Sequence, residues 1–291
     1  MKQKLLAVLL VLSGLLAMTA CGEDSDGDFN LNRQINVIAR ESGSGTHQAF
    51  IEILGIEVRG TDGSVRDMTT IDAEIAQSTS AVIQSVAGNH FSIGYISLGS
   101  LNDSVSAVSV DGVLPTAENV QNGTYPLFRT FYIAVQHEPD PLTQEFINFI
   151  LSAEGQALAA DGYVPADSSA APYVSSGTFS GTVVVSGSTS VLRLMGRLEE
   201  AFEAIHPDVN VEVHAGGTSA GINAAISGTA QIGMSSRELR PNELETLNAV
   251  AIAYDGLAVI VNSYNPLPNL TSEQIRQVFV GDIGSWGGLV D

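Results

Sequence analysis

Short runs of β-branched and apolar residues alternate along the chain with stretches in which apolar residues recur every three or four positions. Such an alternation of strand and helix patterns is typical of an α/β domain. The strand pattern covers residues 35–39, 92–96, 131–135, 182–185, 210–213, 249–253 and 257–261. The helical pattern covers residues 46–54, 82–86, 144–151, 191–205, 221–227 and 272–278. Residues 166–180, rich in Ala, Ser, Gly and Pro, are the best candidate for a linker.

The first residues have the pattern of a bacterial export signal. Lys2 and Lys4 precede an apolar run at 5–17, and small residues stand before Cys21. The apolar run is shorter than the ~20 residues that a membrane-spanning helix needs. We therefore predict a lipoprotein signal peptide at residues 1–20.

Cys21 is the only cysteine, which excludes a disulfide framework. A stray reactive thiol and a lipidated new N-terminus are the two interpretations, and the position after a signal peptide favours lipidation. The acidic residues that follow predict a solvated tether at 21–33. The protein is then exported and anchored to a membrane by lipid alone, in the periplasm or on the cell surface.

Charge narrows the choice of partners. The formal net charge is −20, and both lysines lie in the signal segment, so the remaining chain has ten Arg against 32 Asp and Glu, a charge of −22. This balance argues against nucleic acid and anionic membrane as partners. It also repels anionic ligands at long range, but screening over roughly 8 Å leaves the decision to nearby donors.

Three segments share one design, in which a strand runs into a loop of Gly, Ser and Thr that opens a helix. They are Arg40 to Thr46, residues 186–190 and residues 216–221. Each would present unpaired backbone N–H groups and hydroxyls at the positive end of a helix, which suits an anion. An ordinary Ser/Thr cap explains any single loop. Three together, with the forked guanidinium of Arg40, favour an anion site.

Two further places are candidates. Ser235, Ser236 and Arg237 follow a strand and offer two hydroxyls and a second guanidinium; a capped turn is the alternative. Asp255, between Tyr254 and Gly256, is either a turn former or an acceptor for a proton of the ligand.

An enzyme is the alternative from another class, because residues 217–221 satisfy the Gly-x-Ser-x-Gly pattern of a nucleophile elbow. That pattern needs a histidine after the serine, and none follows Ser219. The five histidines show no metal-ligand spacing, the run 24–28 lacks the Gly and Glu of an EF-hand, and no Walker A motif occurs. We predict no catalysis, no cofactor and no bound metal.

The motifs together resemble the phosphate-binding proteins of phosphate ABC importers, within the periplasmic-binding-protein superfamily. The resemblance covers nearly the whole chain after the signal. It rests on the segments 185–190, 216–222, 231–237, 253–256, 40–46, 94–99, 149–157 and 162–165. The order differs from that of the family, in which the segment at 185–190 stands near the N-terminus and the segment at 162–165 near the C-terminus. The resemblance therefore implies a circular permutation joined through residues 166–180, although part of a tandem array would read the same.

The resemblance implies a two-lobed type II periplasmic-binding-protein fold, α/β, with the ligand in the cleft between lobes. One lobe would comprise residues 34–126 plus 255–291, and the other residues 127–254, including the linker. The residues that the family motif places on phosphate are Arg40, Ser44, Gly45, Thr46, Thr189, Ser190, Thr218, Ser219 and Ser236. Ser236 stands where some members have an Asp that accepts the phosphate proton, so Asp255 is our candidate acceptor.

The predicted function is capture of inorganic phosphate by a monomer and its delivery to an ABC transporter permease. Sulfate brings no proton, so a buried carboxylate facing it would be left unpaired, at a cost of several kcal/mol. A binder of sulfate or molybdate and a phosphate sensor without a transporter remain the alternatives, with the serine hydrolase behind them.

Overall fold

The computed structural model describes residues 29–60 and 64–290. The chain divides into a short unit, Met1–Asn30, and a compact unit, Leu31–Asp291, and the elements below belong to the second. Cys21 and the predicted signal peptide lie outside the described residues. Within those residues, no helix is long and apolar enough to span a membrane.

One sheet carries most of the strands, in the order β11-β10-β12-β8-β13-β5-β1-β4, with β6 and β9 also paired to β13. Its strands are β1 (Asn36–Arg40), β4 (Glu74–Ala76), β5 (Ser92–Ser97), β6 (Val105–Ala107), β8 (Phe128–Gln136), β9 (Val164–Pro165), β10 (Gly181–Gly187), β11 (Val209–Ala215), β12 (Ile232–Ser235) and β13 (Leu247–Asn262). Two small sheets pair β2 (Glu57–Arg59) with β3 (Val65–Asp67), and β7 (Ser109–Val110) with β14 (Asn269–Leu270).

The helices lie between these strands, as the alternating pattern predicts. They are α2 (Gly45–Ile53), α3 (Thr79–Gly88), α4 (Ala117–Gln121), α5 (Pro141–Leu151), α6 (Ala153–Ala159), α7 (Leu192–Ile205), α8 (Thr218–Ser227), α9 (Pro241–Leu244) and α10 (Ser272–Val280), with short 3-10 turns at Leu98–Ser100 and Trp286–Leu289. The six predicted helices correspond to α2, α3, α5, α7, α8 and α10. The three that sequence reasoning missed, α4, α6 and α9, are all shorter than eight residues.

Separate apolar cores define two lobes. We call the lobe predicted at residues 127–254 the continuous lobe. In it, α5, α6 and α7 cover one face of β8, β10, β11 and β12, where Phe146, Phe202 and Met234 are buried. Helix α8 covers the other face with Ile222 and Ala225. The second core joins β1 and α3 to the far half of β13, which contributes Ala258 and Ile260. This second, two-segment lobe draws on both ends of the described chain.

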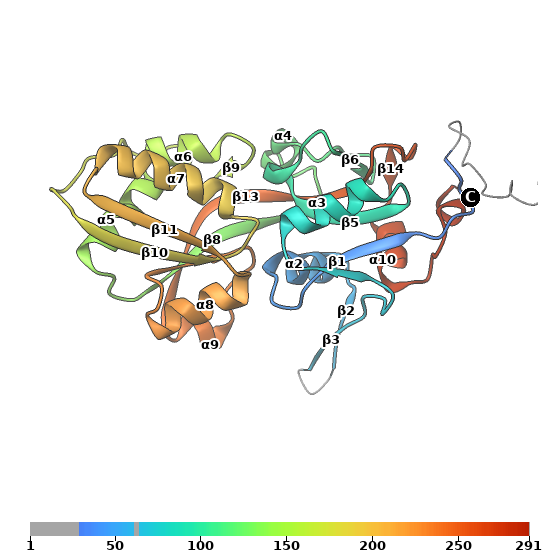
Figure 1. Ribbon diagram of the computed structural model, residues 1–291, viewed down its shortest axis with the longest axis horizontal. Helices are drawn as coiled ribbons and strands as arrows, with labels where there is room; N and C mark the ends of the chain where they lie inside the picture. Colours follow the sequence, from blue (N-terminus) through green and yellow to red (C-terminus); the bar gives the residue numbers. More distant parts are fainter. Residues whose placement is uncertain (1–28, 61–63, 291) are drawn as a thin grey trace, which may run out of the picture. The chain divides into compact units, whose positions relative to one another are not determined.

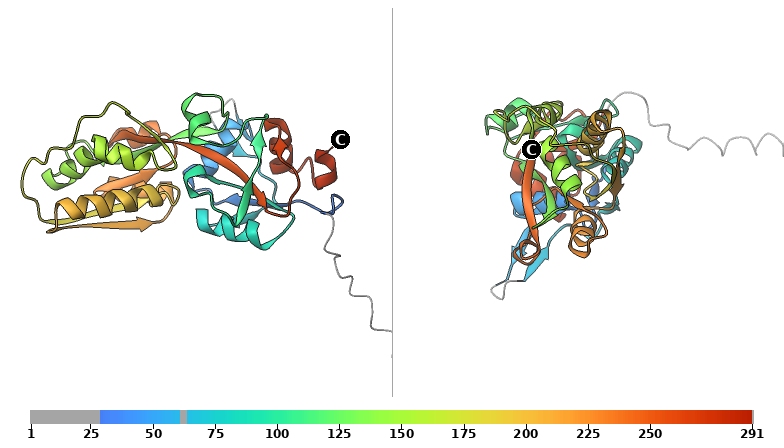
Figure 2. Two further views of the ribbon diagram at one scale, coloured as in Figure 1. Left: turned by 90° about the horizontal axis from the view of Figure 1, so that it is seen from above. Right: turned by 90° about the vertical axis from the view of Figure 1, so that its left-hand side faces the viewer.

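Strands β8 and β13 run from one lobe into the other, as Figures 1 and 2 show. The two predicted strands at 249–253 and 257–261 are in fact one strand of 16 residues, with a register irregularity between Ala251 and Ala253. A turn at Asp255 was therefore the wrong interpretation, because Asp255 pairs across the strands with Arg129 and Gly256 with Phe128.

Residues at both ends of the compact unit lie side by side. The backbone N–H of Ile35 donates to Gly284 (2.9 Å), and that of Gly287 donates to Leu31 (2.7 Å). In Figure 2 the amino-terminal blue segment and the carboxy-terminal red helices lie in the same lobe. Residues 166–180 contain no helix or strand.

Candidate functional site

Three loops from the two lobes meet at the ends of β1, β10 and β12. Arg40 is the last residue of β1, and the Ser44 hydroxyl caps α2 by accepting the N–H of His47. Glycines allow the close approach of the facing loops. Gly217, the residue before α8, has φ 83°, and a Cβ on Gly187 would lie 2.4 Å from the carbonyl oxygen of Met234.

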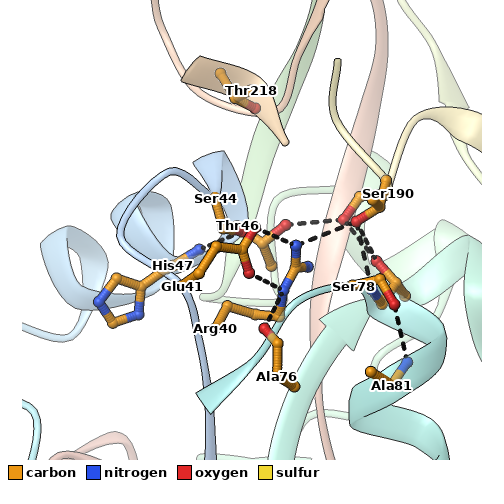
Figure 3. A network of polar contacts seen from close by, with 12 residues as sticks. Arg40, Glu41, Ser44, Thr46, His47, Ala76, Ser78, Ala81, Ser190 and Thr218 are labelled. Carbon is orange, nitrogen blue, oxygen red and sulfur yellow. Dashed lines mark hydrogen bonds and ion pairs between the residues drawn. The ribbon is translucent and has the colours of Figure 1, made fainter. Parts of the chain in front are cut away.

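Hydroxyl groups join the lobes directly. Thr46 Oγ1 and Ser190 Oγ lie 2.8 Å apart, and both side chains are buried. Thr79, which opens α3, lies 3.2 Å from Ser190 Oγ and 3.3 Å from Thr189 Oγ1. Figure 3 shows this network around Arg40 and Ser190. We refer to Thr46, Thr79, Thr189, Ser190, Ser188, Thr218 and Ser236 as the hydroxyl cluster.

Gly45 sits against the remaining part of the cluster. A Cβ at this position would lie 2.5 Å from Thr218 Oγ1 and 2.7 Å from Ser236 Oγ. Ser236 Oγ also accepts a hydrogen bond from Ser188 (2.9 Å). The N-terminus of α2 therefore lies against hydroxyls of the continuous lobe, an arrangement that suits a bound anion.

Arg40 supplies positive charge at the cluster. Its guanidinium donates to Glu41 through Nε (2.8 Å) and Nη2 (2.9 Å), to the Ala76 carbonyl (3.2 Å) and to Thr189 Oγ1 (3.2 Å). The side chain is only 2% exposed. Burial and these hydrogen bonds hold the guanidinium in one orientation, with Glu41 as its ion-pair partner.

A polar chain fixes the backbone beneath Arg40. The Arg40 N–H donates to the Tyr95 hydroxyl (3.0 Å), which lies 2.7 Å from Nδ1 of His47, and His47 Nε2 lies 2.6 Å from Asp67. Burial alone would raise the pKa of Asp67, but hydrogen bonds from Thr69 and His47 outweigh it and keep this pKa below its usual value. Both ring nitrogens of His47 therefore have hydrogen-bond partners, Tyr95 at Nδ1 and Asp67 at Nε2.

The structure brings together eight of the residues that the motifs placed on the anion: Arg40, Ser44, Gly45, Thr46, Thr189, Ser190, Thr218 and Ser236. Ser219 also lies at the contact, through its backbone N–H, which donates to the Gly43 carbonyl (3.1 Å).

Asp255 lies apart from the hydroxyl cluster. It is 1% exposed, and its carboxylate accepts hydrogen bonds from Ser97 (2.8 Å) and from Arg129 (3.0 and 3.2 Å). Arg129 links it to the cluster, because Nη1 of Arg129 donates to the carbonyl oxygen of Ser236 (3.4 Å). Its contacts are those of a partner for Arg129.

Sequence reasoning missed Thr79, Glu41 and Arg129. Residues 77–80, a run of Gln-Ser-Thr-Ser before an apolar helix, have the same Ser/Thr helix-opening pattern as the other loops, so that rule would have found Thr79. Arg129 sits inside a strand, and nothing local marks it.

The histidines do not support the hydrolase alternative. Each has its own surroundings in the described chain: His47 contacts Tyr95 and Asp67, and the others contact Tyr264, Asn248, Tyr173 and Glu212. Ser219 donates its backbone N–H to the Gly43 carbonyl, and the described residues contain no group of three His, Cys, Asp or Glu side chains able to hold a metal ion.

Comparison with known proteins points the same way as the geometry. The family described as the PBP superfamily domain matches residues 24–154 and 174–288. The phosphate-binding protein PstS 2 of Streptococcus pneumoniae serotype 4 is 41% identical over 287 residues, 98% of each chain. PstS 2 of Streptococcus agalactiae serotype V is 38% identical over 293 residues, 99% of each.

A solved structure also matches. The phosphate-binding protein of a phosphate ABC transporter from Streptococcus pneumoniae superposes with a TM-score of 0.71 at 42% identity, covering 88% of this chain and all of that one. At this identity and score, the similarity extends to sequence as well as fold.

Proposed function

Because the chain belongs to the PBP superfamily, and within it to the family of PstS phosphate-binding proteins, we propose that it binds inorganic phosphate and delivers it to an ABC importer. The observation that carries the proposal is the meeting of Arg40, the N-terminus of α2 and hydroxyls from both lobes at one buried place. Backbone N–H groups, hydroxyls and a guanidinium are the donors that a tetrahedral oxyanion requires.

The mechanism is closure of two lobes without a covalent step. Arg40, Gly45 and Thr46 hold the anion from the two-segment lobe, and Thr189, Ser190, Thr218, Ser219 and Ser236 hold it from the continuous lobe. Each hydroxyl replaces a water of the anion's hydration shell. The closed arrangement, which joins both lobes, is the form that the permease would recognise.

Residues outside the described range complete the proposal. Residues 1–20 direct export and Cys21 carries the lipid that tethers the protein, as a monomer, to the membrane in the periplasm or on the cell surface. Palmitate labelling of the wild type but not of C21A tests this anchor. Label on both chains would contradict it.

Calorimetric titration tests phosphate binding. Heat should appear with phosphate and be much weaker with sulfate or molybdate. R40A should weaken phosphate binding by about 100-fold or more, because it removes two or more charge-assisted hydrogen bonds at a buried site. The matched control is R59A, which deletes an arginine that is 64% exposed in the same lobe. No heat with any oxyanion, or equal losses in R40A and R59A, would contradict the proposal.

A further inference from the structure

A buried ion pair lies in the two strands that cross between the lobes. Arg129 of β8 and Asp255 of β13 are directly opposite in the antiparallel register. Their side chains are 3% and 0% exposed, and Arg129 contacts one carboxylate oxygen through both Nε and Nη2. Isolated buried ions are costly, and such pairs persist where their geometry is tightly held.

Each partner of the pair reaches a different lobe. Asp255 accepts the hydroxyl of Ser97, the last residue of β5 in the two-segment lobe. Arg129 donates through Nη1 to the carbonyl oxygen of Ser236, a residue of the hydroxyl cluster that lies in the continuous lobe. The Arg129 guanidinium also lies over the ring of Phe131, 5.1 Å from its centroid, which fixes its plane.

The groups around the Asp255 carboxylate come from several elements, and the backbone N–H of Gly99 donates to it. Tyr125 precedes β8, Tyr163 precedes β9, and Gly99 of the turn after β5 accepts a hydrogen bond from Arg193 of α7. Burial lowers the pKa of Arg129 against the opposing effect of Asp255, and the nearby guanidinium of Arg40 lowers it as well. The guanidinium groups of Arg40 and Arg129 therefore both face the hydroxyl cluster. Of their two carboxylate partners, Glu41 and Asp255, Asp255 is the one that is wholly buried.

We propose that Arg129, oriented by Asp255, is a positioning residue for oxyanion capture: it fixes the Ser236 loop and adds a buried positive charge without touching the ligand. This inference rests on the proposed function. Asp255 then acts on the anion through Arg129, and its charge state sets how much of the Arg129 charge the anion experiences.

Binding is consequently linked to a proton. Burial raises the pKa of Asp255 to about 6, against the opposing effects of Arg129 and Ser97. A bound anion repels the carboxylate and raises this pKa further, so phosphate binding takes up a proton. Affinity therefore rises as pH falls towards 6. A bound-state pKa one unit higher corresponds to uptake of about half a proton per phosphate near pH ~6.5.

Titration calorimetry of the intact protein, in buffers of different ionisation enthalpy between pH ~5.5 and ~8, measures this uptake. D255N should lose the extra proton uptake and flatten the pH dependence of phosphate affinity, because protonation of phosphate itself contributes equally to both proteins. R129K keeps the charge but lacks the fork, and should weaken phosphate binding about tenfold.

E145Q is the matched control, because Glu145 is equally buried, at 1% exposed, but binds Ser176 and Tyr173 instead. It should leave affinity and proton uptake unchanged. S97A removes the hydroxyl that donates to Asp255. Because that hydrogen bond lowers the pKa of Asp255, its loss should move the proton uptake to higher pH. This variant provides the test if D255N or R129K no longer shows the circular dichroism spectrum of a folded protein.

Equal proton uptake in wild type, D255N and S97A, or an R129K affinity equal to that of E145Q, would overturn the inference. Failure of the wild type to bind phosphate would overturn the proposed function instead.

Discussion

Gly45 shows how a single missing Cβ permits two loops to touch. A methyl group here would lie within 2.7 Å of both Thr218 Oγ1 and Ser236 Oγ, which belong to the opposite lobe. Because these oxygens are held by their own hydrogen bonds, they have little room to retreat. The conflict affects closure and spares the packing inside either lobe.

G45A should therefore weaken phosphate binding by about 100-fold or more, with a change in unfolding free energy below ~1 kcal/mol. Calorimetric titration and urea unfolding measure the two quantities. G43A is the control in the same loop, since a Cβ there meets nothing nearer than Ser219 Cβ at 3.9 Å. Similar affinities for the two variants would show that the loops do not need this contact to bind the anion.

The sequence predicted those residues of the site that the neighbouring positions in the chain identify. Thr46 and Thr218 lie in the first turns of helices that follow strands, and Arg40 ends the strand before one of them, so the pattern of a helix N-terminus marks this region without knowledge of the fold. The pair of Arg129 and Asp255 could not be found this way, because it arises from cross-strand pairing between residues 126 positions apart.

Helical glycines have opposite roles in two elements of the continuous lobe. Gly221 of α8 faces the end of β10, and a Cβ would lie 2.3 Å from the Ser186 carbonyl oxygen and 2.4 Å from Gly187 Cα. Gly196 of α7 has open space around it. The first glycine lets α8 approach the sheet, and the second only weakens its helix.

G221A should lower the unfolding free energy by about 2 kcal/mol or more, because backbone atoms cannot yield to the added methyl group. G196A should raise it by about 0.5–1 kcal/mol through helix propensity. Urea unfolding followed by circular dichroism distinguishes them. A stabilising G221A would mean that α8 can shift away from β10 without loss.

The spacing of apolar residues predicted which segments are helices and which are strands, but it did not predict where a strand continues without a break. The sequence Tyr254-Asp255-Gly256 is typical of a turn, yet β13 continues through it. Each of these residues pairs with a residue of β8, and apolar residues on either side of them in β13 are buried. The predicted linker likewise has no regular structure, but Glu145 holds it by accepting hydrogen bonds from Tyr173 and Ser176.

At the scale of the molecule, the permuted order of segments remains our prediction. Its physical support is that residues 31–36 and 284–287 lie within hydrogen-bond distance of one another, as Gln34 and Ser285 show by their β-bridge. The family match omits residues 155–173, which overlap the predicted junction, but the PstS 2 relatives align across this stretch in the same order as this chain. Closely placed ends are the condition under which permutation preserves a fold.

A rearranged chain tests the order directly. It would begin at Ala170, end at Ser169, and join Val290 to Leu31 through a short Gly/Ser linker. We expect phosphate affinity within about threefold of the parent, because the opened backbone is exposed and the new join spans neighbouring residues. A chain opened between Ala258 and Val259, inside β13, is the control and should not fold. Loss of folding in the first chain would contradict the prediction.

Strand β13 belongs to both cores, with Ile252 and Ala253 in one and Ala258 and Ile260 in the other. Unfolding of either lobe would remove the packing partners of half of β13 and expose apolar residues of the other lobe. We therefore expect the lobes to unfold as one cooperative unit, even though the proposed function requires them to move relative to each other. Flexibility at a hinge and independence in folding are separate properties, and a strand shared by two cores argues against the second while leaving the first open.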